Sequence, residues 1–207
     1  MDGRQSIAPG HGANAVKPTL IIMVKEPHPG RVKTRLGRDI GMTAAAWWFR
    51  HQTRQLIRRM QDPRWHVVLA VAPDTQGLQS RVWPKHLIRW PQGCGNLGDR
   101  MARMLGQVVR GPACVIGADV PGIRRHHIAE AFRTLGAHDA VFGPAPDGGY
   151  WLIGLKHPRR QPPKLFKDVR WSSEHALADT KATMPGYRIA EIATLRDVDD
   201  VTDLTMT

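Results

Sequence analysis

The sequence contains only two cysteines, Cys94 and Cys114, which form neither a disulfide framework nor a metal-ligand pattern. It also lacks any apolar run near the ~20 residues that span a bilayer, because the longest candidates, 19–24 and 113–118, have the length of strands. Residues 1–18 lack the apolar segment of a secretory signal peptide. We therefore expect a cytoplasmic protein with no membrane span.

Acidic residues are few relative to basic ones, since 18 Asp and Glu stand against 30 Lys and Arg, and the formal net charge is +12. Such a charge is typical of proteins that bind nucleic acid. The basic residues are scattered along the chain, however, and no zinc-finger or RNA-recognition signature accompanies them. Nucleic acid is therefore not expected as the main partner, although a non-catalytic binder of RNA or of an acidic partner stays open as an alternative.

Strand-like and helical segments alternate along the sequence, which is typical of an α/β protein. We expect strands at 20–24, 66–71, 86–90, 113–116, 139–142 and 150–155, and helices at 42–60, 97–110, 123–135 and 172–183. This alternation predicts a three-layer sandwich in which helices cover both faces of a mainly parallel, Rossmann-like central sheet. We expect residues 1–16 to be a flexible leader and residues 17–207 to form a single domain.

A basic loop, VKEPHPGRVKTRLG (24–37), directly follows the first expected strand. Lys25, Lys33 and Arg35 could neutralise a diphosphate, and Gly30 would allow the main chain to approach a ligand closely. The stretch is not a Walker loop, because no Gly-x-x-x-x-Gly precedes Lys33. The alternative is a solvated basic turn from which Lys33 and Arg35 enter a helix.

Two aspartates follow expected strands at the edge where ligands of open α/β sheets bind. Asp119 comes directly after the strand at 113–116, and Mg²⁺ or Mn²⁺ is commonly held there by one or two carboxylates together with substrate phosphates. The alternative for Asp119 is an N-cap of the next helix. Asp147 could be a second metal ligand, and its alternative is a plain hairpin turn, since Asp-Gly is a strong turn signal.

A helix start at Asn96 could receive a base or a phosphate, with Asn96 and Gly98 as nucleotide contacts. The alternative is that Asn96 is only an N-cap, with Asp99 in the capping-box position. An acidic cluster at 197–200 is usually solvated or caps a helical turn, and Asp199 within it is a further candidate metal contact.

Several segments together resemble a bacterial family of uncharacterised, glycosyltransferase-like proteins with the GT-A, nucleotide-diphospho-sugar transferase fold. The family also resembles 2-phospholactate guanylyltransferases and, more distantly, molybdenum-cofactor nucleotidyltransferases. The matching segments are KEPHPGRVKTRL (25–36), GNLGDRM (95–101), IGADVP (116–121), GPAPDGGYWLIGL (143–155), LFKDVRWSS (165–173) and RDVDDVTDL (196–204).

This resemblance implies a role for the residues that match. It makes Lys25, Lys33 and Arg35 phosphate ligands and Asp119 the metal ligand, and it favours Asp147 as a second metal contact. The chain departs from the family at Asn96, where the family often has Asp, and at Val120, where it often has Ser. A single Asp119 also stands in place of the contiguous Asp-x-Asp metal motif of GT-A enzymes.

From these residues we expect a transferase that depends on Mg²⁺ or Mn²⁺ and uses a nucleotide, with Asp119, Asp147 and Lys33 as catalytic residues. A glycosyltransferase-like reaction with a nucleotide-diphospho-sugar is the first hypothesis. The second is nucleotidyl transfer from a triphosphate to a phosphorylated small molecule. Its partners would then be a small-molecule nucleotide and an acceptor that the sequence does not identify.

Overall fold

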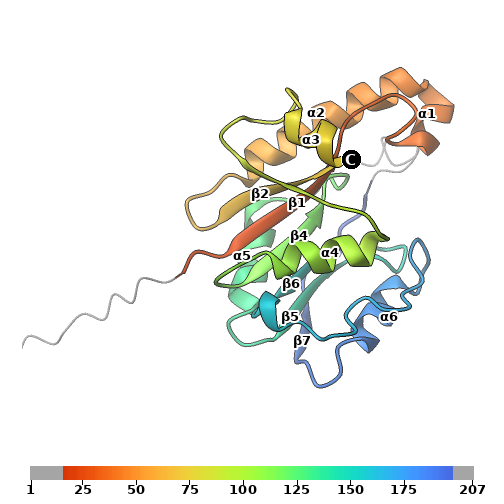
Figure 1. The fold of residues 1–207 in the computed structure, drawn as a ribbon. Helices are drawn as coiled ribbons and strands as arrows, with labels where there is room; N and C mark the ends of the chain where they lie inside the picture. The colour runs from red at the N-terminus through yellow and green to blue at the C-terminus, as the bar shows by residue number, and fades with distance from the viewer. Residues whose placement is uncertain (1–15, 198–207) are drawn as a thin grey trace, which may run out of the picture.

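The computed structural model describes residues 16–197, which form a seven-stranded sheet with helices on both faces (Figure 1). The strands are β1 (Thr19–Lys25), β2 (His66–Ala72), β3 (Ile88–Pro91), β4 (Ala113–Gly117), β5 (Ala140–Pro144), β6 (Tyr150–Leu155) and β7 (Ile189–Glu191). Their order across the sheet is β3-β2-β1-β4-β6-β5-β7. Only β6 runs against its neighbours β4 and β5, while the other pairs are parallel. The mainly parallel α/β sheet predicted from the sequence is therefore confirmed.

The helices are α1 (Thr34–Ile40), α2 (Met42–Met60), α3 (Asp74–Gln79), α4 (Leu97–Gly106), α5 (Arg125–Thr134) and α6 (Ala176–Ala182), with a short 3₁₀ turn η1 (Pro158–Arg160). The sheet separates two cores because successive residues of a strand point to opposite faces. Leu20 and Ile22 of β1 pack on the side that holds α2 and α5, whereas Ile21 packs with α4 on the other side. Figure 1 shows α4 in front of the sheet and α5 behind it.

The structure corrects several expected boundaries. The helix expected at 97–110 ends at Gly106. The helix expected at 172–183 begins only at Ala176, because Ser172 has a left-handed backbone with φ 58° that a helix cannot contain. Short elements such as α3 and β7 had no sequence prediction. The leader predicted at 1–16 lies almost entirely outside the described residues.

No helix among residues 16–197 is long and apolar enough to cross a membrane. Of the two cysteines, Cys94 is exposed and Cys114 is buried in β4, and both are free thiols. Burial raises the pKa of the Cys114 thiol, so this side chain packs as a small apolar group rather than a nucleophile.

His127, at the start of α5, is a buried histidine whose protonation is expected to destabilise the folded protein. Its Nδ1 accepts a hydrogen bond from the backbone N–H of Arg124 at 3.1 Å, which requires that nitrogen to carry no proton. Burial lowers the pKa of His127, and the nearby charges of His126 and Arg124 lower it further against the opposing effect of Glu130. As pH falls below about 6.5, the unfolded chain takes up a proton that the folded chain resists.

We therefore expect the free energy of unfolding to decrease as pH falls through about 6.5 toward the lower pKa of the folded state. The variant His127→Asn keeps an oxygen that can accept from the backbone, and it should show a weaker loss. Denaturant unfolding at about pH 7.5 and about pH 5.5 measures the difference. His66→Asn, which alters an exposed histidine of β2, should keep the wild-type pH dependence. If wild type and His127→Asn lose the same free energy of unfolding between the two pH values, this assignment is contradicted.

Candidate active site at the carboxyl edge of the sheet

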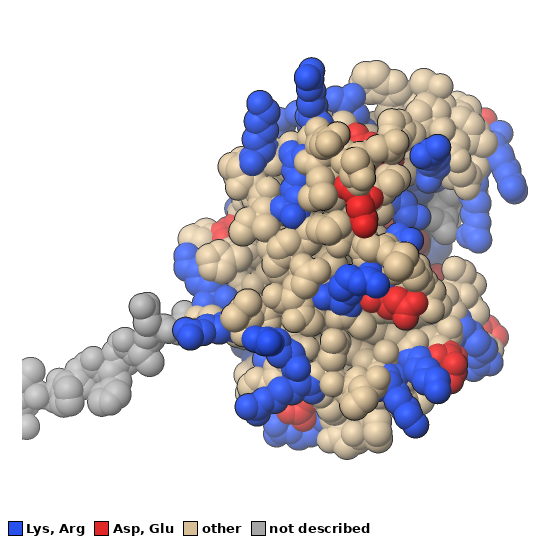
Figure 2. Space-filling view, viewed as in Figure 1, with Lys and Arg blue, Asp and Glu red and all other residues tan. Residues whose placement is uncertain are grey.

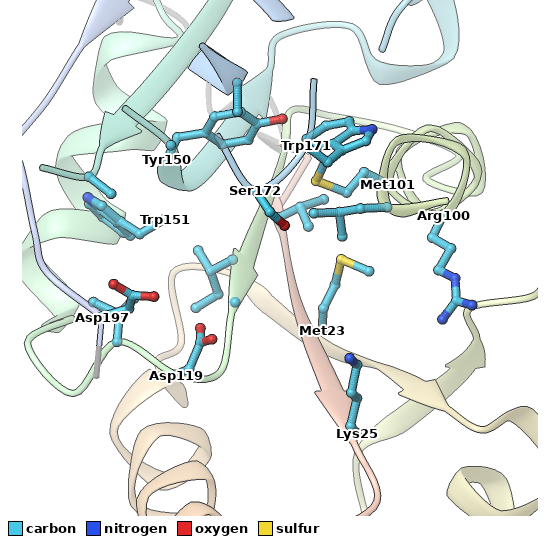
Figure 3. A pocket seen from close by; sticks show the side chains of 18 of the residues that line it. Met23, Lys25, Arg100, Met101, Asp119, Tyr150, Trp151, Trp171, Ser172 and Asp197 are labelled. Carbon is cyan, nitrogen blue, oxygen red and sulfur yellow. The ribbon is translucent and has the colours of Figure 1, made fainter. Parts of the chain in front are cut away.

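A cavity of about 730 Å³ opens at the carboxyl ends of the central strands. β1 contributes Met23 and Lys25 to it, and Gly117 at the end of β4 stands in register with Met23. The loop after β1, the start of α4, the β5–β6 turn and the segment 171–173 complete the wall. Because parallel strands end together at one edge, segments far apart in sequence meet at this cavity, as Figure 3 shows.

The basic loop reaches the cavity through an unusual backbone turn. Lys33 has a left-handed conformation with φ 45° and stands as the N-cap residue of α1. Its side chain is only 7% exposed, and its Nζ donates a hydrogen bond to Asp119 Oδ2 at 3.2 Å. A buried ammonium requires such a partner. The two residues, 86 positions apart in the sequence, are therefore in direct contact.

Four more cationic side chains line the same cavity: Lys25, Arg31, Arg35 and Arg100. Arg35 lies in the first turn of α1. The alternative interpretation of the loop, a basic turn that leads into a helix, is therefore also present in the structure. Arg100 had no sequence prediction. It lies in the first turns of α4, where its Nε donates to the Gly95 carbonyl at 3.1 Å. Arg100 lies four residues after the N-cap Asn96, about one helical turn into α4, and this spacing could have indicated that it lies on the same side of the helix as its N-terminus.

Three carboxylates lie around the cavity: Asp119, Asp147 and Asp197. The Asp119 side chain is 40% exposed, and it follows β4 without capping α5, whose N-cap is Arg124. Figure 3 shows Asp197 beside Asp119, with both carboxylates directed into the cavity. The candidate Asp199 lies outside the described residues. Asp197 was missed as a site residue, although the acidic cluster that contains it was noted.

Asp147 is both a turn residue and a cavity residue. Its Oδ1 accepts from the Gly149 N–H at 2.9 Å, and Ala145 and Gly149 close the hairpin between β5 and β6 by a backbone bond of 3.0 Å. The turn alternative for Asp147 is thus present in the structure. The exposed carboxylate also lines the cavity, so the turn does not remove it from the site.

Three residues proposed as nucleotide contacts do not line the cavity: Gly30, Asn96 and Gly98. Gly30 is exposed with φ 74° at the outer bend of the loop. Asn96 and Asp99 form a reciprocal capping box at 3.0 and 2.9 Å, which uses the side chain of Asn96 on its own helix. Gly98 is buried, and a Cβ there would meet Phe166. These three positions therefore lie outside the lining of this cavity, and their role as nucleotide contacts stays a prediction.

Apolar and aromatic side chains also line the cavity. They are Met23, Met101, Tyr150 and Trp171, and Ser172 projects between them in Figure 3. The Tyr150 ring packs edge-on with Trp171 at 6.4 Å between centroids. Burial raises the pKa of the Tyr150 hydroxyl, which stays protonated at neutral pH. The cavity thus combines charged side chains with an aromatic pair.

The overall structure is similar to those of several solved proteins. A candidate nucleotide-diphospho-sugar transferase from Desulfovibrio desulfuricans G20 is 26% identical, with a TM-score of 0.79 over 91% of this chain and 85% of that one. A 4-diphosphocytidyl-2C-methyl-D-erythritol synthase from Anaerococcus prevotii DSM 20548 is 8% identical, with a TM-score of 0.57 over 92% and 95% of the two chains. Rv0371c from Mycobacterium tuberculosis H37Rv, solved with manganese, is 13% identical, with a TM-score of 0.54 over 92% and 96%.

The fold class predicted from the sequence, that of the nucleotide-diphospho-sugar transferases, is confirmed by these neighbours. No curated protein matches the chain in sequence. Residues 55–173, more than half of the chain, match the family described as "Uncharacterized protein conserved in bacteria (DUF2064)", and the chain belongs to this family.

Proposed function

We propose that this protein is a metal-dependent transferase that uses a nucleotide-diphospho-sugar as donor. One observation carries the proposal: a cationic loop and the carboxylate of Asp119 share one cavity, with Lys33 Nζ 3.2 Å from Asp119 Oδ2. The similarity to the Desulfovibrio desulfuricans protein supports a donor of this class.

The cations of the cavity would bind and stabilise the leaving diphosphate. Lys25 and Lys33 offer point charges, while Arg35 offers a planar guanidinium that can donate to two oxygens at once. Negative charge builds on the diphosphate as its bond to the transferred group breaks, and fixed cations lower the free energy of that state. Lys33 is held before the ligand arrives, because its ammonium is already buried against Asp119.

The carboxylates fit a hard divalent cation. The described residues contain no group of three or more histidine, cysteine, aspartate or glutamate side chains that could hold a metal alone. Asp119 and Asp197 supply two carboxylates on one side of the cavity, with Asp147 as a further candidate. Mg²⁺ and Mn²⁺ commonly take one or two carboxylates and complete their shell with substrate phosphates and water. When bound, such an ion supplies charge neutralisation at the phosphates.

The aromatic pair of the cavity, Tyr150 and Trp171, would contact the uncharged part of the donor or the acceptor. Tyr150 and Trp171 offer ring faces and edges for a base or a sugar, while Ser172 offers a hydroxyl at an exposed, left-handed position. Trp171 and Ser172 follow one another in the chain, so one short segment supplies both a stacking surface and a hydrogen-bonding group.

The charge balance of the cavity favours a second candidate, nucleotidyl transfer from a nucleoside triphosphate. Five cationic side chains stand against three carboxylates among the described lining residues. This surplus suits a ligand with more negative charge than a metal-bound nucleotide-diphospho-sugar, such as a triphosphate or a phosphorylated acceptor. The two reactions release different products, since glycosyl transfer yields a nucleoside diphosphate and nucleotidyl transfer yields pyrophosphate.

A thermal-shift screen of nucleotides and nucleotide sugars, with and without Mn²⁺, tests the proposal. A ligand at about 100 times its dissociation constant should add about 2.7 kcal/mol to the free energy of unfolding and raise Tm. Product analysis with the best ligand then separates the two reactions. A protein whose Tm responds to no nucleotide, with or without metal, would contradict both and favour a non-catalytic binder.

Lys33→Met should abolish most of the nucleotide-dependent shift while it keeps the length of the buried side chain. The ammonium that binds phosphate and faces Asp119 is lost in this variant, so nucleotide affinity should fall at least tenfold, as expected for a charged hydrogen bond. Lys85→Met is the matched control, because Lys85 is exposed and lies outside the cavity. Equal nucleotide shifts in the two variants would remove Lys33 from the site.

A further inference from the structure

A second cavity of about 1080 Å³ lies on the sheet face that α2 and α5 cover. It includes Pro18, which precedes β1, and Trp65, which precedes β2, so it lies toward the amino ends of these strands. The first cavity reaches Lys25 at the other end of β1, about 20 Å away at the usual rise of a strand. The two cavities share no lining residue. This second cavity is called the arginine cavity because five arginines line it: Arg59, Arg64, Arg124, Arg125 and Arg133.

Among residues 16–197, few carboxylates lie near this positive charge. Asp62 binds Arg64 through two hydrogen bonds of 2.8 Å, which lower the pKa of Asp62, and the more distant charge of Arg125 also lowers it. Glu130, the one carboxylate in the lining, approaches Arg133 only to 4.0 Å. Between residues 16 and 197, no carboxylate forms an ion pair with the other three arginines, which are Arg59, Arg124 and Arg125.

The arginine side chains are also held in place. Arg125 Nε donates to the Arg59 carbonyl at 2.7 Å, which joins the start of α5 to the end of α2. Arg124 donates to the Pro121 carbonyl at 2.8 Å. Arg59 Nε is buried without a hydrogen-bond partner among the described residues, and burial, together with the charge of Arg124, lowers the pKa of Arg59. A nearby anion would favour the charged form of this guanidinium.

The floor of the arginine cavity is apolar. Trp65 packs against Phe132 at 5.9 Å between ring centroids, and Arg64 covers the face of Trp65 at 4.8 Å. Because the Arg64 guanidinium already covers this face of the Trp65 indole, a nucleobase cannot stack on that face. The recognition offered here is therefore chiefly for a compact anion of high charge, with room for an adjoining apolar part.

We propose that the arginine cavity binds the phosphate groups of a phosphorylated ligand, at a site separate from the first cavity. Three guanidinium groups that form no ion pair with a carboxylate of residues 16–197 match the several oxygens and the multiple charge of a diphosphate better than the single charge of a carboxylate. This site does not depend on the proposed transferase function, because none of its residues lines the cavity that holds Asp119.

Calorimetric titration with inorganic pyrophosphate, without metal and at fixed ionic strength, tests the arginine cavity. The double variant Arg124→Gln and Arg125→Gln should lose at least tenfold in affinity for one equivalent of pyrophosphate. The matched control is Arg54→Gln with Arg58→Gln, which removes the same charge from exposed positions of α2 outside both cavities and should bind as wild type does. The inference is overturned if the two double variants bind pyrophosphate equally, or if wild type binds none.

Lys33→Met separates this result from the proposed function. Pyrophosphate binding that survives Lys33→Met and disappears in the Arg124 and Arg125 double variant supports the arginine cavity, even if the first cavity binds nothing. Binding that disappears in Lys33→Met alone supports the first cavity and overturns this inference.

A titration with a single-stranded RNA oligonucleotide identifies the source of the phosphate groups. If the oligonucleotide binds the arginine cavity at least tenfold more tightly than pyrophosphate, nucleic-acid phosphates are the source of the anion; weaker binding identifies a small phosphorylated molecule.

The distribution of charge elsewhere agrees with a localised site. Figure 2 shows lysines and arginines dispersed over the face that carries α4, several of them beside acidic side chains. Arg170 with Asp179 and Arg188 with Asp139 form ion pairs elsewhere in the protein. The arginine cavity differs because three of its cations form no ion pair with the part of the chain that the structure describes.

Discussion

Asp119→Asn is expected to reduce the transfer rate by about 10³-fold and to abolish the effect of Mn²⁺ on nucleotide binding. The substitution keeps the shape of the side chain and removes its charge. It thereby removes the carboxylate proposed to hold the metal and the acceptor that binds Lys33 Nζ at 3.2 Å. Both losses act at the phosphates, so the rate should fall far more than the stability of the fold.

The measurement combines the product assay with thermal shifts in the presence and absence of Mn²⁺. Asp39→Asn is the matched control, because Asp39 is an exposed residue of α1 that does not line the cavity. This control should keep wild-type activity and the wild-type Mn²⁺ response. A fully active Asp119→Asn protein would exclude Asp119 from the metal site. Parallel variants at Asp147 and Asp197 then decide which of the two is the second metal contact.

Gly148→Ala is expected to destabilise the protein by about 3 kcal/mol or more and to inactivate the site. Gly148 has φ 82°, a conformation that residues with a Cβ rarely adopt. A Cβ at this position would also collide with the backbone of Glu174. The Gly148 carbonyl accepts from the Leu177 N–H at 3.0 Å, so the collision would force the β5–β6 turn away from the start of α6. Asp147 lies in this turn, and it would move with it.

Gly186→Ala provides the comparison that isolates the collision. Gly186 has a similar φ of 79°, but no atom lies within 4 Å of the place where its Cβ would stand. Its substitution should cost only the backbone strain, about 1–2 kcal/mol. Denaturant unfolding of both variants gives the two values. If the two glycines cost the same, close packing between the turn and Glu174 contributes nothing to stability.

Buried strands and a long helix could be predicted because their sequences carry strong local signals. The continuous apolar run of β1 marks a strand covered on both faces, and residues 42–60 contain no glycine or proline to interrupt α2. The placement of β6 between β4 and β5 is set by contacts between distant segments, and no local pattern encodes it. The start of α6 was misplaced for a different reason, namely the left-handed backbone of Ser172, which the sequence pattern did not reveal.

The candidate site was predictable where a residue directly follows a strand. Lys25 and Asp119 were found in this way, because the carboxyl ends of β1 and β4 are neighbours in the sheet. Arg100 reaches the cavity from a helix, and Asp197 comes from a segment near the end of the described chain. Arg100 and Asp197 reach the cavity only because α4 and the segment before residue 197 pack beside the carboxyl edge of the sheet. The strand pattern of the sequence does not specify this packing. Lys33, Arg35 and Asp147 were proposed from the composition of the loops that contain them, and the family resemblance strengthened these assignments.

The reversed direction of β6 has a consequence for how the two ends of the cavity wall are connected. The turn that leads into β6, residues 145–149, lines the cavity together with the basic loop, and it is held both by the paired strands β5 and β6 and by the hydrogen bond from the Leu177 N–H to the Gly148 carbonyl. A change at this hairpin tip would therefore be transmitted to the start of α6, whereas the basic loop is fixed separately by β1 and α1.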